Sequence, residues 1–524
     1  MNRQQKEELD AVKRSYECGK EFKSRIGLYE RADENERFYR GDQWSSVDSE
    51  GLPTPVFNLI RRISSYLVSS VMSYSMSAVY DDAALACRDE CGAKRRAYAN
   101  LDSLSKAVAD RWERLGMEKI FRDALTDAVI TGDGIIYCWF DPHSGAGAGI
   151  SAATVDNTEF FAADMNSPDI QSQDYIMLAG RDSVSKLRRE AASRGLSDAE
   201  ISLIKPDGDT DCRQNFCENG DEKAEKVTYL IKFSRDDDGY VRFIKCTENV
   251  IIADEQTKLR YYPVAFFNWE PAKHCLHGSS PISEMIGNQK YVNKAFAMEM
   301  KHMVDTAFSK VIYDKRLIPE WSNEVGEAIG VMSGGDVSGA VATVGTGQMQ
   351  DGYIEIIDRV ITYTKELEGA TEAALGEVDP TNTSAILALR ESSDLPLERV
   401  RSNFYSAVVS LALIFADMMK EYLPDRVRYS KDGGDVGKVD LGALDMKNLC
   451  AKVEIGSSRR FSSSLMLSTL GSLLEGGHIT FDEYLEFLPD GVIKGKERLM
   501  RKKDRKDAEK TDAENERKGE NANG

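Results

Sequence analysis

Apolar residues recur every three or four positions along much of the chain, which is the spacing of one buried helical face. In residues 2–40 this face carries Leu9, Val12 and Tyr16. The same spacing predicts further helices over residues 58–74, 92–131, 183–204, 282–310, 353–375 and 384–423. The last of these is expected to bend at Pro396, because proline interrupts helical hydrogen bonding. Helices are therefore expected to form most of the fold.

Other stretches alternate with a period of two and are rich in β-branched and aromatic residues, which is typical of strands. Residues 135–140 read IIYCWF directly after a Gly-Asp-Gly sequence. Residues 227–233 (VTYLIKF) and 240–246 (YVRFIKC) flank an Asp-Gly turn and predict a β-hairpin. Further strands are expected in residues 261–270, 311–313 and 425–460. The predicted fold class is α+β, mainly helical.

Composition and charge narrow the classes of protein to which the chain could belong. The chain has 524 residues and a formal net charge of −19, whereas proteins that read DNA or RNA usually carry a basic surface. The nine cysteines show no compact spacing, which argues against a disulfide framework. The N-terminal MNRQQKEELD lacks the apolar segment of a signal peptide, and the longest uncharged apolar stretch, 402–416, is shorter than the roughly 20 residues that span a bilayer. We expect a protein of a reducing cytoplasm without a membrane segment.

Three segments invite a catalytic or metal-binding interpretation, and each also has a plainer one. The glycine-rich residues 326–352 lack the lysine that a phosphate-binding loop requires. His274, Cys275 and His277 offer three soft ligands, but structural zinc sites usually take four ligands from two separated pairs. Residues 236–239 begin like a calcium loop but have no glutamate at its twelfth position. We therefore expect no catalytic residue, no metal and no cofactor.

Five stretches carry a family resemblance. They are ERFYRGDQW at 36–44, LPTPVFNLIRRISSYLVSSVMS at 52–73, GDGIIYCWFD at 132–141, the strand and long helix at 263–313, and LEGATEAALGEVDPTNTSAILALRE at 367–391. In this order and spacing the chain resembles the portal proteins of tailed bacteriophages, of the siphovirus type. The glycine-rich segment has no counterpart in that pattern.

The resemblance implies a portal fold with wing, clip, stem and crown regions, assembled as a cyclic ring. The regions implied are an N-terminal wing at 1–224, a clip at 225–281, a stem helix at 282–310, further wing at 311–396, a crown at 397–493 and a charged, disordered tail at 494–524. Twelve copies are expected in the ring.

Two sets of site residues follow from the resemblance. Residues 374–383 resemble the tunnel loop that narrows the DNA channel, with Gly376, Glu377, Asp379 and Asn382 as its candidates. Glu377 and Asp379 without any Lys or Arg would suit a constriction that must not trap phosphates. The plainer interpretation is a surface loop with solvated acids.

The stem helix supplies the second set: Lys290, Lys294 and Lys301. Their spacings of four and seven residues place them on one helical face. They could form a weak basic band along the channel or pair with acids on the next subunit.

The function implied is the channel at one capsid vertex through which double-stranded DNA is packaged and ejected. Its implied partners are other copies of the chain, the DNA, the terminase large subunit, a head–tail adaptor, and the major capsid and scaffolding proteins, with no membrane. The location implied is the portal vertex of the virion, after assembly in the host cytoplasm. Alternatives are another structural phage component, such as a head–tail adaptor or capsid protein, or an enzyme such as an ATPase or nuclease.

Overall fold

The chain divides into two compact units, the first comprising Met1–Val71 with Ala78–Val453 and the second Met72–Ser77 with Glu454–Gly524. The computed structural model describes residues 3–45, 49–82, 91–141, 149–207, 226–307, 311–320, 331–332, 341–343, 352–371, 395–424, 427–430, 436–442, 444–458, 470–480 and 484. Helices and antiparallel sheets alternate along the first unit, so the predicted α+β class is confirmed.

Two helices form the N-terminal segment, α1 (Arg3–Arg25) and α2 (Leu28–Arg40). A single helical stretch was predicted, but Gly27 adopts a left-handed φ of 65° and separates the two. Gly41 ends α2 with a φ of 96°, and its N–H is bonded to the carbonyls of Arg37 and Phe38. The predicted apolar face of α1 is buried as expected.

The next helices are α3 (Leu59–Val71), α4 (Cys91–Leu115) and α5 (Met117–Thr131). Residues 92–131 were predicted as one helix, and Gly116, with a φ of 65°, divides it into two. Gly132 ends α5 with a φ of 95°, a conformation that residues with a side chain rarely adopt.

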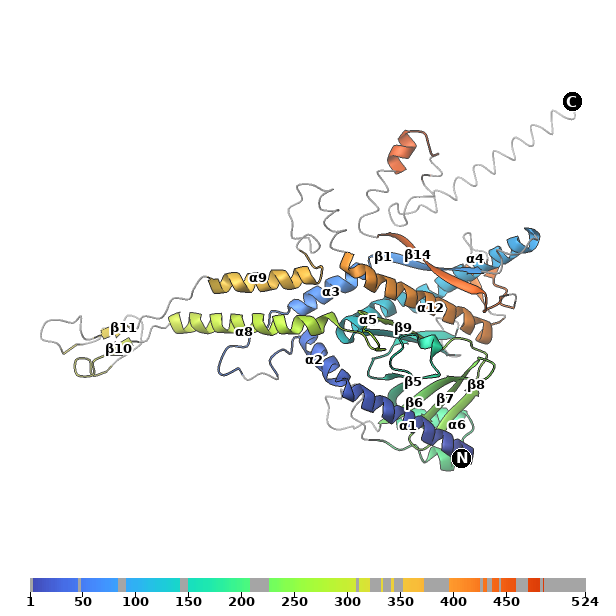
Figure 1. Cartoon of the computed structure of the whole chain (residues 1–524), viewed down its shortest axis with the longest axis horizontal. Coiled ribbons are helices and arrows are strands. Elements are labelled where there is room, and N and C mark those ends of the chain that lie inside the picture. Colours follow the sequence, from blue (N-terminus) through green and yellow to red (C-terminus); the bar gives the residue numbers. More distant parts are fainter. Residues whose placement is uncertain are drawn as a thin grey trace. The chain divides into compact units, whose positions relative to one another are not determined.

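A three-stranded antiparallel sheet of order β3-β2-β9 is built from β2 (Asp133–Phe140), β3 (Ile150–Thr154) and β9 (Val264–Asn268). Helices α5 and α12 (Glu398–Tyr422) pack on it, as Figure 1 shows. Aromatic rings join the three elements. The ring centroid of Phe404 in α12 lies 5.7 Å from that of Phe121 in α5 and 5.4 Å from that of Phe267 in β9.

A second antiparallel sheet has five strands in sequential order. They are β4 (Phe160–Ala162), β5 (Tyr175–Ser183), β6 (Lys226–Arg235), β7 (Val241–Thr247) and β8 (Ile251–Gln256). The predicted hairpin is confirmed as β6–β7, with Gly239 at a φ of 82° in its turn. A short 3₁₀ helix, η2 (Ile170–Ser172), precedes β5.

The expected helix at 183–204 is two helices, α6 (Val184–Ser193) and α7 (Asp198–Ile201), separated by Gly195 at a φ of 81°. Helix α6 buries Val184, Leu187 and Ala191 in a cluster shared with β6 and β8. The five-stranded sheet therefore has an apolar core of its own.

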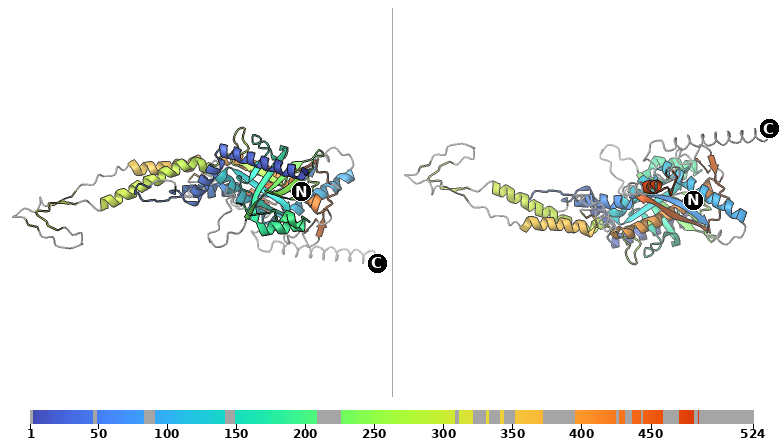
Figure 2. Two further views of the ribbon diagram at one scale, coloured as in Figure 1. Left: turned by 90° about the horizontal axis from the view of Figure 1, so that it is seen from below. Right: turned by 90° about the horizontal axis from the view of Figure 1, so that it is seen from above.

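A pair of helices forms an arm, α8 (Pro281–Ala307) and α9 (Gly352–Leu367), which lie side by side in Figures 1 and 2. Between them in the chain, β10 (Val311–Tyr313) pairs with β11 (Val341–Thr343) in antiparallel register. The predicted long helix and the strand after it are confirmed.

Helix α12 follows a 3₁₀ turn, η3 (Leu395–Leu397), which contains Pro396. The part of the predicted helix before Pro396, residues 384–394, lies outside the described residues. The helical segment Leu395–Tyr422 is long and apolar enough to cross a membrane, with a mean hydropathy of 1.4 in its most apolar window. The protein buries 61% of that window, as expected for a core helix. Its contacts with β9 and α4 agree with that interpretation.

The C-terminal part holds short strands. They are β12 (Arg428–Ser430), β13 (Val436–Lys438) and β14 (Leu449–Ser458); β12 pairs with β13, and β14 pairs with β1 (Tyr74–Asp82). Residues 470–475 form a short helix. The charged tail at 494–524 lies outside the described residues.

Candidate functional site

A buried network of amide side chains anchors the arm at the base of α8. Gln289 donates to the carbonyl of Phe57 at 2.8 Å and accepts from the N–H of Leu59 at 3.0 Å. It also donates to Asn293 at 2.9 Å, and Asn293 donates to Gln43 at 2.6 Å. All three amides are buried. Because buried amides must be paired, this network fixes α8 against the segment that leads into α3.

A second set of contacts holds the first turns of α8. Asn35 of α2 donates to the carbonyl of Ile130 at 2.7 Å and to the hydroxyl of Ser283 at 2.9 Å. Ser280 donates to the carbonyl of Val129 at 2.6 Å. The start of α8 is therefore bonded to both α2 and α5.

The three predicted stem lysines have different surroundings. Lys290 forms an ion pair with Glu34 of α2 at 2.8 Å and lies 5.2 Å from the ring centroid of Phe38. Lys294 and Lys301 are exposed, and within the described part of the chain neither has an ion pair. At about 100° per residue, the three positions fall within roughly 40° of one another, as the spacing predicted.

Large apolar side chains are exposed along both helices of the arm. Those more than two-fifths exposed are Tyr291, Met298, Met303 and Val304 on α8, and Ile354, Ile356, Tyr363 and Leu367 on α9. Tyr291 and Met298 lie next to the lysine face, roughly 80–100° around the helix from Lys290. Large exposed apolar side chains gathered on one element are typical of a contact surface.

Just before α8, a buried carboxylate organises the joint between the sheet and the arm. Asp133 accepts from Nδ1 of His277 at 2.7 Å, from Asn268 at 2.7 Å, from the N–H of Gly278 at 2.8 Å and from Asn157 at 3.1 Å. Nε2 of His277 is buried and has no hydrogen-bond partner among the residues that the structure describes. An imidazole with its proton on Nδ1 suits this site, because an Nε2–H would be a buried donor without an acceptor.

One of the three possible metal ligands, His277, has a structural role in this joint. His277 is buried against Asp133, whereas His274 is exposed with a φ of 54° and Cys275 is half-buried. Among the residues that the structure describes, no group of three or more His, Cys, Asp or Glu side chains is placed to hold a metal ion.

Lys23 is a functional candidate that the sequence reasoning missed. Its ammonium group is buried and donates to the carbonyls of Asn157, Thr158 and Phe160 at 2.6, 3.1 and 2.5 Å. Burial lowers the pKa of Lys23 to about 7, against the opposing effect of nearby acids led by Asp156. Lys23 lies seven residues after Tyr16 on the apolar face of α1, and a lysine on that face was the available signal.

The candidate tunnel-loop residues Gly376, Glu377, Asp379 and Asn382 lie outside the described residues. The glycine-rich segment at 326–352 lies mostly outside them too. Neither set contributes to the described site.

A two-helix arm with exposed apolar and basic side chains, anchored by buried polar contacts, offers a surface for contact with other chains. A family model described as phage P22-like portal protein matches residues 27–430, well over half of the chain. The chain therefore belongs to the phage portal protein family, and the family predicted from the sequence is confirmed. No curated protein matches the chain.

Proposed function

We propose that the chain is the subunit of a ring-shaped channel at one capsid vertex, through which double-stranded DNA is packaged and ejected. The family membership over residues 27–430 carries this proposal and implies a structural, capsid-associated oligomer at the virion vertex. The arm supports it, because its exposed apolar side chains need a partner surface.

Neighbouring copies are the proposed partners of the arm. A closed ring joins one face of each subunit to a different face of the next. Tyr291 and Met298 on α8, with Ile354 and Tyr363 on α9, supply apolar contacts for such a joint. Twelve copies remain the expected number.

Loose contact with DNA is the proposed role of the channel wall. A net charge of −19 opposes a tight grip on phosphates. Lys290 is already paired with Glu34, so Lys294 and Lys301 are the proposed basic positions toward the DNA or toward a neighbouring subunit. The segment 374–383, with Glu377 and Asp379, stays the proposed tunnel loop.

The clip stays proposed at residues 225–281, as the family resemblance implies. Within 225–281, strands β6, β7 and β8 belong to the five-stranded sheet that packs with α6. We propose residues 225–281 as the contact for the terminase large subunit and the head–tail adaptor.

The remaining regions keep their proposed roles, with α8 as a stem helix, residues 1–224 in the wing, 397–493 in the crown and 494–524 as a charged tail. Capsid and scaffolding proteins are the proposed outer partners. Assembly is proposed to take place in the host cytoplasm.

The proposed function can be tested by measuring the DNA content of phage particles that are assembled without this chain. Infected cells that lack the chain should yield particles without nuclease-protected DNA, and the chain supplied in trans should restore packaging. Normal DNA content in its absence would overturn the proposal.

A further inference from the structure

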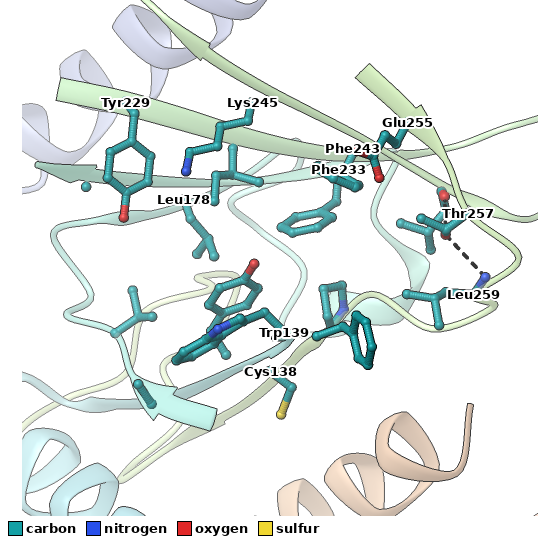
Figure 3. Close-up of a pocket in the computed structure, with 18 of the residues that line it drawn as sticks. Cys138, Trp139, Leu178, Tyr229, Phe233, Phe243, Lys245, Glu255, Thr257 and Leu259 are labelled. Carbon is teal, nitrogen blue, oxygen red and sulfur yellow. Dashed lines mark hydrogen bonds between the residues drawn. The ribbon is translucent and has the colours of Figure 1, made fainter. Parts of the chain in front are cut away.

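A cavity of about 680 Å³ lies between the three-stranded sheet and the five-stranded sheet. Figure 3 shows Trp139 of β2 on one side of it and Leu178, Phe233 and Phe243 of the larger sheet on the other. Cys138 points the opposite way, toward the helix below. The period of two along β2 thus sends Tyr137 and Trp139 into the cavity and Cys138 into the core.

Aromatic rings form a continuous wall of this cavity. The rings of Tyr137 and Trp139 stack with centroids 5.4 Å apart and an interplanar angle of 24°. Phe233 lies 6.0 Å from Tyr137 and 6.2 Å from Phe243. A flat apolar molecule could stack against these rings.

The hydroxyl of Tyr137 is a polar group on this wall. Burial raises the pKa of Tyr137, so the hydroxyl keeps its proton. The hydroxyl of Thr257 donates to the carbonyl of Val241 at 2.5 Å and accepts from Leu259 at 3.2 Å. A phenolic hydroxyl can donate or accept a hydrogen bond with a bound molecule.

Six of the charged residues that line the cavity are paired with one another, and the seventh, Glu159, has its pKa raised to about 7 by burial. Lys245 contacts Glu190 at 2.7 Å, and Arg194 pairs with Glu255. Lys186 contacts Asp182 at 2.6 Å. A charged guest would lose its hydration without gaining a free counter-charge, so these pairs favour an uncharged one.

We propose that this cavity is a binding site for a small, flat, uncharged molecule that carries one hydrogen-bonding group. The apolar part of the molecule lies against Tyr137 and Trp139, and its polar group bonds the hydroxyl of Tyr137. The volume lies within the roughly 300–1,000 Å³ of ordinary small-molecule sites. The site does not depend on the proposed channel function, because the first unit contains every lining residue.

The test uses 1-naphthol, an uncharged two-ring alcohol, titrated into the full-length protein by calorimetry. We expect one saturable site per chain with a Kd of about 0.1 mM, from ordinary affinity per atom for a molecule of this size. Naphthalene-1-sulfonate, an anion of the same ring size, should bind at least ten times more weakly. Absence of saturable 1-naphthol binding would overturn the proposal, as would equal binding of the anion.

Two variants locate the bound molecule. Ala153 lies directly opposite Tyr137 in the β2–β3 register and lines the cavity, so Ala153→Phe should fill the space and weaken binding at least tenfold. Tyr137→Phe keeps the ring and should weaken binding about fivefold through the lost hydrogen bond. Tyr98→Phe, on the exposed surface of α4, should leave binding unchanged.

Circular dichroism would show whether each variant is folded. If Ala153→Phe fails to fold, the smaller Ala153→Leu serves in its place. Unchanged binding in folded variants at both Tyr137 and Ala153 would place the molecule elsewhere and refute the assignment.

Discussion

Replacing Gln289 by leucine should loosen the base of α8. The change keeps the approximate size of the side chain but removes its three hydrogen bonds, to the carbonyl of Phe57, the N–H of Leu59 and the side chain of Asn293. Each buried partner left unpaired costs about 1–3 kcal/mol. Some compensation comes from the added apolar contact of leucine, so we expect a net loss of about 3 kcal/mol.

Hydrogen exchange measured by mass spectrometry is the direct assay, because it reports the opening of individual segments. A loss of about 3 kcal/mol corresponds to an opening that is roughly 100-fold more frequent. Peptides covering the first turns of α8 and the start of α3 should therefore exchange about 100-fold faster. Lys294→Leu, an exposed position about one turn further along α8, should leave the exchange of both segments unchanged.

The reasoning fails if Gln289→Leu leaves exchange at the base of α8 unchanged. It also fails if Lys294→Leu accelerates exchange as much as Gln289→Leu does. In either case the buried amide network would not be what anchors the arm.

Three further predictions concern pH, backbone geometry and assembly. Burial raises the pKa of Glu159 to about 7 from 4.5, so this carboxyl favours folding below pH 4.5 and loses that contribution as the pH rises to 7. In urea titrations the free energy of unfolding should fall between pH 4.5 and 7.5, and it should fall by about 2 kcal/mol less in Glu159→Gln than in the unchanged protein. An equal fall in both proteins would contradict this. A Cβ on Gly132 would lie 2.6 Å from the carbonyl oxygen of Gly278, so Gly132→Ala should lower the melting temperature more than Gly195→Ala, which has open space; equal shifts would count against the steric argument. Met298→Asp, at an exposed position on α8, should weaken self-association at least tenfold in analytical ultracentrifugation, and unchanged association would remove α8 from the interface.

Elements with a strong local pattern could be predicted from the sequence. The β6–β7 hairpin follows from alternating residues around an Asp-Gly turn, and α8 follows from its helical spacing. Boundaries at Gly27 and Gly116 were missed, because the apolar spacing continues across both glycines and only their left-handed conformation separates the helices.

Contacts between distant parts of the chain explain what the sequence could not reveal. Gln289 meets Phe57 and Leu59 across more than two hundred residues, and nothing near Gln289 in the sequence indicates those partners. The cavity likewise requires two sheets that only the fold brings together. Lys23 is different, since its place on the apolar face of α1 was visible in the pattern.

Residue spacing predicted the lysine face of α8 but could not predict the ion pair that Lys290 forms. Spacing predicts that Lys290, Lys294 and Lys301 share one face of α8, whereas the ion pair of Lys290 with Glu34 depends on how α2 packs against α8. Family membership was predictable because ordered segments along most of the chain share the portal pattern.

Electron microscopy of the purified chain, combined with its mass from light scattering, tests the central claim most directly. The account predicts rings with a central hole and, for twelve copies of 58.4 kDa, a mass of about 0.7 MDa. Compact monomers or dimers without a hole, at every protein concentration and ionic strength, would contradict it.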